Sequence, residues 1–568
     1  MRFTGKRRFA EIVVSVGLAA AVSGTLAYAN RKIVRNYFPL ADEWSILANS
    51  HPRVADPQGW FTKGFRDYFT PPAGLPNLQG FLFSRPLFNA TYWAVGRRAE
   101  PESGRYLQIS HVGVGVCAGM TTLAVARSGG SLRSAAGTGA VLPLMPALVP
   151  SMTLLIHPCM AFDPLAAAVT QGATIAYEGG RLRTAAALLT AALLTKETAL
   201  PTAAALPTLY ALENRGRLLR DGRARRSLLA LAAPAAAWFA VRRATFGPSS
   251  IEDSAYVFRP DPRGKLMRQA RIAAKFPFWV NYGSLGERGL TVNKVAAGSL
   301  LLSNAAVVAG AVVELASRLR AGRPPSPDES SLAASYAFLL AMGTSSRYGV
   351  ALDMSMLHAL VQWRRERGRP SRAARVVSAG LALGVATNTV LTAKEYPRLE
   401  RNFLAYADVG RKYVTALRRF GAGERVLVLN DPVTFWAPVK FLTRTLGIKA
   451  EVIKLADHPY SRDNLDGMTN TSIVSLEPPA GPGEPWRFSQ SRGIDILSSH
   501  PLLPNDEPVH VDYGDGITID LEPFASDVPP TDDHQRWEAM RIMPGDRPAH
   551  LLYYDPATGE FETVAVNA

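Results

Sequence analysis

Long apolar runs recur along the first 395 of the 568 residues and then stop. A helix of about 20 apolar residues is long enough to cross the roughly 30 Å hydrocarbon layer of a bilayer. The pattern predicts a mainly α polytopic membrane domain over residues 1–395, with about eleven transmembrane helices. The runs at 184–195 and 198–212 are short, and they form either a broken pair or one bent hairpin. The predicted segments are 10–29, 107–126, 135–156, 164–178, 184–195, 198–212, 227–241, 295–317, 330–345, 349–363 and 374–393.

The charges between these runs alternate along the chain. The short connections at 157–163, 196–197 and 346–348 hold at most one Lys or Arg each. Cytoplasmic loops of membrane proteins are rich in Lys and Arg, so we expect a multi-pass plasma-membrane protein with a cytoplasmic N-terminus. A soluble Ala- and Leu-rich helical protein would have no reason to alternate in this way. Basic residues gather in the N-terminal segment and at 127–134, 178–183, 213–226, 318–329 and 364–375.

The net charge of +16 and the pI near 9.9 need not indicate a nucleic-acid partner. A nucleic-acid-binding protein presents its Lys and Arg side chains on one polar surface. Here the excess of basic residues lies in the predicted cytoplasmic connections, so we expect no nucleic-acid partner. The two cysteines, Cys117 and Cys159, are too few for a disulfide framework or a four-ligand zinc site.

Three regions are expected on the outer face. Residues 30–106 form a first loop whose aromatic, amphipathic stretches suit helices lying in the membrane interface. Residues 242–294 form a second loop, and residues 396–568 form a soluble domain. Residues 1–29 also resemble a signal peptide, but their apolar core is long, and we favour a retained first helix.

The C-terminal segment predicts an extracytoplasmic α/β domain. An amphipathic helix near 398–419 leads to a βαβ-like unit, with strands at 426–429 and 451–455 around a helix near 433–446. No Gly-rich dinucleotide fingerprint follows the first strand. Further strands and a closing hairpin are expected at 472–476, 508–513, 517–521, 551–554 and 561–566.

Few charged residues fall on the predicted outer face. Asp42 and Glu43 follow the first span, where one carboxylate could act as a general base toward a hydroxyl and the other could bind a metal or orient a partner. A solvated turn is the alternative. Lys196 and Glu197 interrupt a long uncharged stretch, so they face water, a cavity or one another.

Two arginines on the same face could hold phosphate. Arg347 and Tyr348 lie between two late spans, and an Arg side chain binds phosphate bidentately. A snorkelling Arg beside an interfacial Tyr is the alternative. Arg85 could add a second contact, although a surface Arg before a Pro-kinked helix is the simpler interpretation. His157 and Asp163 lie at another outer connection, where a lone His is more often a structural residue than a catalyst.

In their order and sidedness, these residues resemble the GT-C class of polyprenyl-phosphate-sugar glycosyltransferases. The chain is similar to protein O-mannosyltransferases and to bacterial transferases that add aminoarabinose to lipid A. The resemblance covers roughly residues 10–395, and Asp42-Glu43 stands where many members have Asp-Asp. The motifs that carry it are Asp42-Glu43, Arg85-Pro86-Leu87, Leu194-Thr195-Lys196-Glu197-Thr198 and Arg347-Tyr348.

The resemblance implies an inverting transfer from a polyprenyl-phosphate-linked sugar to a lipid, glycan or protein acceptor. Asp42, with Glu43 beside it, would take the proton from the acceptor hydroxyl. Glu197 would orient Lys196, and a divalent cation is left open. The donor phosphate would be bound by Arg347, Lys196, Arg85 and Tyr348. The alternatives are a polytopic transporter or lipid flippase, or a non-catalytic membrane anchor for the C-terminal domain.

Overall fold

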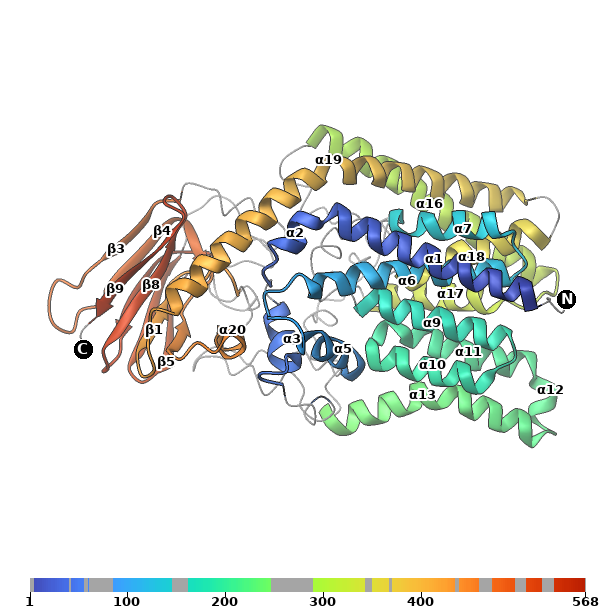
Figure 1. Cartoon of the computed structure of the whole chain (residues 1–568), viewed down its shortest axis with the longest axis horizontal. Coiled ribbons are helices and arrows are strands. Elements are labelled where there is room, and N and C mark those ends of the chain that lie inside the picture. Colours follow the sequence, from blue (N-terminus) through green and yellow to red (C-terminus); the bar gives the residue numbers. More distant parts are fainter. Residues whose placement is uncertain are drawn as a thin grey trace. The chain divides into compact units, whose positions relative to one another are not determined.

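The computed structural model divides the chain into two compact units (Figure 1). Unit 1 comprises residues 1–31, 84–88 and 106–397, and unit 2 comprises residues 32–83, 89–105 and 398–568. The residues that the structure describes are 5–39, 42–55, 60, 85–145, 162–246, 290–342, 350–366, 370–434, 439–458, 472–495, 507–523 and 536–566.

Unit 1 is built from helices, and each of the eleven apolar runs contains one. The short helices η2 (Leu142–Leu144) and η4 (Glu197–Ala199) are 3-10 helices. The α-helices are α1 (Gly5–Ala29), α6 (Arg105–Arg127), α7 (Leu132–Val141), α9 (Phe162–Glu178), α10 (Leu182–Thr195), α11 (Leu200–Glu213), α12 (Arg215–Leu218), α13 (Gly222–Phe246), α16 (Leu290–Arg320), α17 (Pro327–Met342), α18 (Val350–Glu366) and the first part of α19 (Arg372–Leu417).

Four helices in the described part of the chain are long and apolar enough to cross a membrane, namely α1, α6, α16 and α19. They are compatible with a membrane protein, but the expected number of about eleven spans is not confirmed. Helices α9, α10, α11, α17 and α18 have only 14 to 17 residues, fewer than the roughly 20 that cross a bilayer. Many of their apolar side chains are buried within unit 1, and burial in a core produces the same apolar pattern as a span.

The basic connections of unit 1 gather at one end, which we call the basic end. Arg7 in α1 donates from Nη2 to the carbonyl of Gly130 before α7, at 3.3 Å. The hydroxyl of Tyr177 near the end of α9 donates to Oε2 of Glu213, the last residue of α11, at 2.8 Å. Figure 1 shows the N-terminus and α12 at this same end.

Two glycines let α6 pack closely on α1. A Cβ atom added to Gly119 would lie 2.7 Å from the carbonyl oxygen of Ser15, and one added to Gly115 would collide with the carbonyl oxygen of Ala19. Small residues four positions apart lie on one face of a helix, and they allow two backbones to approach. This spacing explains the Gly-rich sequence of an otherwise apolar helix.

Helix α19 joins two predicted helices into one. The expected span at 374–393 and the expected amphipathic helix near 398–419 form one continuous helix of 46 residues. Pro397 lies inside this helix, at the boundary between the two units. Its N-terminal part belongs to unit 1 and its C-terminal part to unit 2.

The C-terminal part of unit 2 contains two sheets. The predicted βαβ unit is present: β1 (Arg425–Val428) pairs in parallel with β2 (Glu451–Lys454), and α20 (Val439–Leu446) lies between them in sequence. The four-stranded sheet has the order β2-β1-β8-β9, and the other sheet is antiparallel with the order β3-β4-β7-β6-β5. The remaining strands are β3 (Val474–Glu477), β4 (Trp486–Asp495), β5 (Val509–Gly514), β6 (Ile517–Pro523), β7 (Arg536–Pro544), β8 (Ala549–Asp555) and β9 (Glu560–Val566).

The sequence did not predict β4 and β7, which form the middle of the five-stranded sheet. The two sheets share one apolar core, with Leu427 and Leu551 from one sheet and Phe488, Ile519 and Trp537 from the other. The predicted closing hairpin is confirmed as β8 paired with β9. It turns at a glycine of φ 71°, a left-handed conformation that favours glycine.

The N-terminal part of unit 2 includes helices α2 (Arg31–Arg35) and α3 (Asp42–Ser50), and most of α5 (Pro86–Gly96). Phe38 packs against Trp44 of α3 and Tyr406 of α19, and all three rings are buried. Tyr92 in the predicted interfacial stretch is buried as well. The described part of the first loop thus packs its aromatic side chains against α19 in unit 2. Residues 61–84 of this loop lie outside the described residues.

Candidate functional site

Four charged side chains converge in unit 1 from three distant places in the sequence. Arg85 directly precedes α5, Asp163 lies in the first turn of α9, and Lys196 and Glu197 separate α10 from α11. Helix α9 runs from Asp163 to the basic end, so these residues lie at the opposite end of the unit. We call Arg85, Asp163, Lys196 and Glu197 the four-charge cluster.

The break between α10 and α11 positions two of these residues. Lys196 has an extended backbone (φ −161°, ψ 146°), which ends α10 after Thr195. Pro201 then falls in the first turn of α11, where the absence of an N–H is tolerated. Because α10 begins and α11 ends at the basic end, the two helices form a hairpin with Lys196 and Glu197 at its tip.

Each cation of the cluster has its own carboxylate. Lys196 Nζ lies 2.6 Å from Asp163 Oδ2. The guanidinium of Arg85 is bidentate on Glu197, with Nη2 to Oε1 at 2.7 Å and Nε to Oε2 at 3.3 Å. Bidentate pairing fixes the plane of the guanidinium as well as its distance.

The two pairs differ in burial. Lys196 and Asp163 are 3% and 2% exposed, whereas the side chains of Arg85 and Glu197 retain 17% and 21% exposure. Burial raises the pKa of Glu197, but the stronger combined effect of Arg85 and Lys196 lowers that pKa to about 2. A buried ion that loses its partner is strongly destabilising, so the inner pair must stay together. The outer pair is the part of the cluster that water or a ligand can reach.

Neighbouring side chains hold the cluster in place. The hydroxyl of Thr198 donates to Asp163 Oδ1 at 3.3 Å. The guanidinium carbon of Arg85 lies 4.7 Å from the centre of the Phe162 ring, in a cation–π contact. Phe162 and Asp163 are adjacent in the first turn of α9. This turn therefore contacts both cations, Arg85 through Phe162 and Lys196 through Asp163.

The acidic pair of the sequence prediction lies in unit 2. Asp42 is the first residue of α3, and its side chain is outside what the structure describes. Glu43 is 1% exposed, and Oε2 accepts a hydrogen bond from the hydroxyl of Tyr37 at 2.5 Å. Glu43 is therefore held within the packed N-terminal part of unit 2.

The remaining predicted phosphate contacts, Arg347 and Tyr348, lie outside the described residues, as does His157. Of the predicted donor-binding residues, the structure brings together Arg85 and Lys196, with Glu197 beside them. The sequence analysis assigned Asp163 no role, and the structure makes it the direct partner of Lys196. The sequence did contain a signal for this role. Asp163 is a carboxylate directly before Pro164, at the start of an apolar run and on the same predicted face as Lys196.

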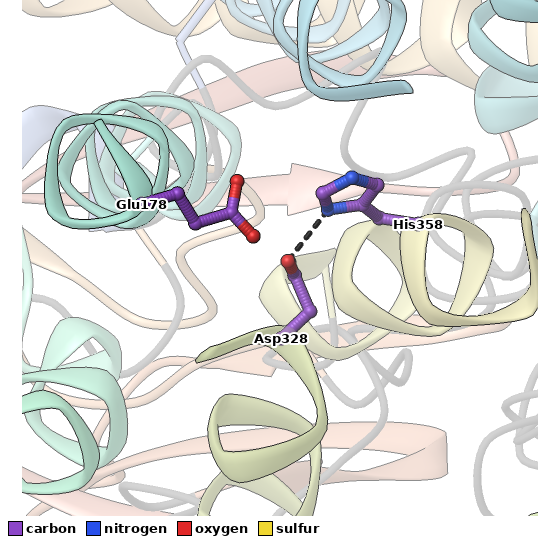
Figure 2. Close-up of side chains that lie close together, drawn as sticks. All are labelled: Glu178, Asp328 and His358. Carbon is purple, nitrogen blue, oxygen red and sulfur yellow. Dashed lines mark ion pairs between the residues drawn. The ribbon is translucent and has the colours of Figure 1, made fainter. Parts of the chain in front are cut away.

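A second group of titratable residues was missed entirely. Glu178 at the end of α9, Asp328 at the start of α17 and His358 inside α18 present donor atoms that all lie within 4.8 Å of one another (Figure 2). We call these three residues the Glu-Asp-His triad. In the sequence, Glu178 and Asp328 fall within two of the predicted cytoplasmic connections, 178–183 and 318–329. Spacings of 150 and 30 residues contain no recognisable metal motif.

The two groups suit different chemistry. In the four-charge cluster both carboxylates are engaged by cations, so it suits recognition of an anion through the partly exposed Arg85. In the triad the carboxylates face an imidazole, and these are ligand types for a divalent cation. No known protein-family model matches this chain. The search of curated proteins likewise gave no match.

Proposed function

We propose that this protein is a membrane glycosyltransferase of the GT-C class. It would move a sugar from a polyprenyl-phosphate donor to a hydroxyl of a lipid, glycan or protein at the outer face of the plasma membrane. The supporting observation is the four-charge cluster: Arg85 and Lys196, which the resemblance assigns to the donor phosphate, meet Glu197 at the end of unit 1 away from the basic end. The proposal includes the eleven-span topology with a cytoplasmic N-terminus.

The lengths of α10 and α11 favour a recessed phosphate site. Each helix has 14 residues, and a helix of that length rises about 21 Å. The hydrocarbon layer is roughly 30 Å thick. If α10 starts and α11 ends at the cytoplasmic surface, the hairpin tip lies in a recess below the outer surface.

In the proposed mechanism, binding energy comes from Arg85. A donor phosphate approaching the exposed side of the cluster would share the Arg85 guanidinium with Glu197, while Lys196 stays neutralised by Asp163. As the bond from sugar to phosphate breaks, negative charge grows on the departing polyprenyl phosphate. Fixed cations stabilise such charge more than they stabilise the ground state, and this difference accelerates the reaction.

The proton would move from the acceptor hydroxyl to the Asp42 carboxylate as the hydroxyl oxygen attacks the anomeric carbon. Attack on the face opposite the leaving phosphate inverts the configuration at that carbon. Arg347 and Tyr348 would add contacts to the phosphate, as the resemblance implies. Glu43 would support the start of α3 through its bond with Tyr37.

The hairpin weakens the case for a transporter. A secondary transporter places its substrate at discontinuous helices that continue across the membrane. Helices α10 and α11 instead reverse direction at Lys196, because the end of α11 returns to the end of α9.

The test is transfer of radiolabelled sugar from polyprenyl phosphate to membrane acceptors by the full-length protein in vesicles. Arg85→Ala should lower the rate by about 100-fold, the effect of removing one donor to a developing charge, and Arg85→Lys should restore only part of it. Arg217→Ala, an exposed arginine of α12 at the basic end, is the control and should leave the rate unchanged. If Arg85→Ala and Asp42→Asn both insert normally and transfer sugar at the wild-type rate, the mechanism is wrong.

A further inference from the structure

The Glu-Asp-His triad joins three helices at the basic end of unit 1. Asp328 and His358 are completely buried, and Glu178 is exposed. Figure 2 shows the Glu178 carboxylate directed toward the space beside Asp328 and His358. Nδ1 of His358 lies 2.6 Å from Oδ2 of Asp328.

A hydrogen bond to Ser128 orients the ring of His358. The hydroxyl of Ser128 donates to the carbonyl of Ala124 at 3.0 Å, and a hydroxyl has a single proton to donate. Ser128 Oγ also lies 2.5 Å from His358 Nε2, and a hydroxyl that donates to Ala124 accepts from Nε2. With its only proton on Nε2, the ring would present the lone pair of Nδ1 to Asp328.

Nδ1 of His358 and Oδ2 of Asp328 are both buried, and they form an ion pair at 2.6 Å. A charged imidazole would hold a proton on Nδ1 in this pair, whereas a neutral imidazole and the carboxylate can share a metal ion.

Asp328 is not needed to begin helix α17. The N-terminal cap is a reciprocal pair, in which the backbone N–H of Ser326 donates to Glu329 Oε2 at 2.6 Å and the N–H of Glu329 donates to Ser326 Oγ at 3.2 Å. Pro327 fills the first helical position. Glu329 is further engaged by Arg318 at 3.1 Å. The neighbouring carboxylate of Asp328 is left to face the triad, where Gln171 Nε2 donates to its Oδ1 at 3.2 Å.

We infer that Glu178, Asp328 and His358 bind one divalent transition-metal ion, such as Mn²⁺ or Zn²⁺, which clamps α9, α17 and α18 together at the basic end. Ligand atoms around a tetrahedral zinc lie about 3.4 Å apart, and in the triad Nδ1 and Oδ2 are 2.6 Å apart while all the donor atoms lie within 4.8 Å of one another. Two carboxylates and a neutral imidazole balance a divalent charge. The imidazole favours a transition metal over Mg²⁺ or Ca²⁺, which prefer oxygen ligands.

The supporting contacts resemble those around metal ligands in general. A ligating histidine usually donates its other ring N–H to a fixed acceptor, which orients the ring and makes the ligand nitrogen more basic. Ser128 provides that acceptor, and Gln171 orients Asp328. The inference does not depend on the transferase proposal, because the triad lies at the other end of unit 1.

The test measures the metal content of the full-length protein, purified in detergent and equilibrated with Mn²⁺ or Zn²⁺ before desalting. We expect about one bound ion per chain and an increase in Tm relative to EDTA-treated protein. Asp328→Asn and His358→Gln should lose the ion. Ser128→Ala should weaken the affinity by about 10- to 100-fold, as loss of a supporting contact does at other metal sites. His111→Gln is the matched control, since His111 is another buried histidine of unit 1, hydrogen-bonded to Asn30 at 3.2 Å.

The wild-type protein loaded with Mn²⁺ provides a readout that does not depend on variants folding. Pulsed electron paramagnetic resonance should detect coupling of the manganese to one imidazole nitrogen. Wild-type protein without bound metal, or with bound Mn²⁺ that shows no nitrogen coupling, would overturn the inference. So would a folded Asp328→Asn/His358→Gln double variant that keeps the ion at wild-type affinity.

Discussion

The two charged groups of unit 1 are opposite in composition. The four-charge cluster has two cations and two carboxylates, and each cation is paired directly. The Glu-Asp-His triad has two carboxylates facing one imidazole. Burial penalises any uncompensated charge. The four-charge cluster is neutral without a ligand, whereas the triad keeps an excess of negative charge that the proposed metal ion would balance. Removing one member should therefore have different consequences in the two groups, and this difference can be tested.

The largest effect is expected from breaking the inner pair of the four-charge cluster. Lys196→Met leaves Asp163 as a buried charge without its ammonium partner, which should lower the free energy of unfolding by about 3–5 kcal/mol. The double variant Asp163→Asn/Lys196→Met removes both charges and should recover most of the loss. Chemical denaturation of the full-length protein in detergent measures both.

Lys412→Ala supplies the comparison for that experiment. Lys412 pairs with Glu560 at 2.7 Å, but both side chains are well exposed, and such pairs contribute at most about 1 kcal/mol. A Lys196→Met variant no less stable than Lys412→Ala would show that the inner pair is not required.

A buried histidine in unit 2 sharpens the contrast with His358. His458 is buried with Nε2 3.1 Å from the amide nitrogen of Gln490. Burial, with a smaller effect of Arg492, lowers the pKa of His458 from 6.5 to about 3. The folded form thus binds fewer protons than the unfolded form below pH 6.5. The contribution of His458 to the free energy of unfolding is fully present above pH 6.5. As the pH falls, the unfolded chain binds a proton that the folded one does not, and the free energy of unfolding is about 2 kcal/mol lower at pH 5.

The measurement is the denaturation midpoint of unit 2 in the full-length protein between pH 7.5 and 5, followed through near-ultraviolet circular dichroism. Other groups also titrate in this range, so the prediction concerns the difference between wild type and His458→Gln. That variant should flatten the pH dependence by the stated amount. Parallel profiles would mean that His458 is not held neutral.

The smallest expected effect concerns the cap of α17. Ser326→Ala removes one half of the reciprocal cap and should lower stability by about 1 kcal/mol, while leaving metal binding by the triad unchanged. Denaturation midpoints and metal content of the same preparation check both parts. If Ser326→Ala loses the metal, then the cap formed by Glu329 and the metal ligand Asp328 are not independent of each other.

Sequence patterns located nearly all the secondary structure. The apolar period identified a helix in every predicted run, and the βαβ unit and final hairpin are also confirmed. The predicted number of spans is not confirmed. Helices α9 to α11, α17 and α18 are short, and burial of their side chains inside unit 1 is enough to explain why they are apolar. Strand β4 was missed because the apolar alternation of Trp486 and Phe488 stops at Gln490, and β7 because its buried residues Trp537 and Met540 break the two-residue period.

The candidate site was predictable in part. Lys196 and Glu197 stood out because charges inside an apolar stretch need a partner or water. Their actual partners could not be read from the sequence, since Asp163 precedes Lys196 by 33 residues and Arg85 precedes Glu197 by 112.

By itself, the sequence determined where the helices lie and which helix ends carry the basic residues, because both follow from local composition and period. Only the tertiary structure decided which charges meet. Pairing of buried charges depends on contacts between segments distant in the chain, and no local pattern records these. Asp328 and Glu329 illustrate this point. They are adjacent in sequence, but Glu329 caps α17 whereas Asp328 belongs to the triad.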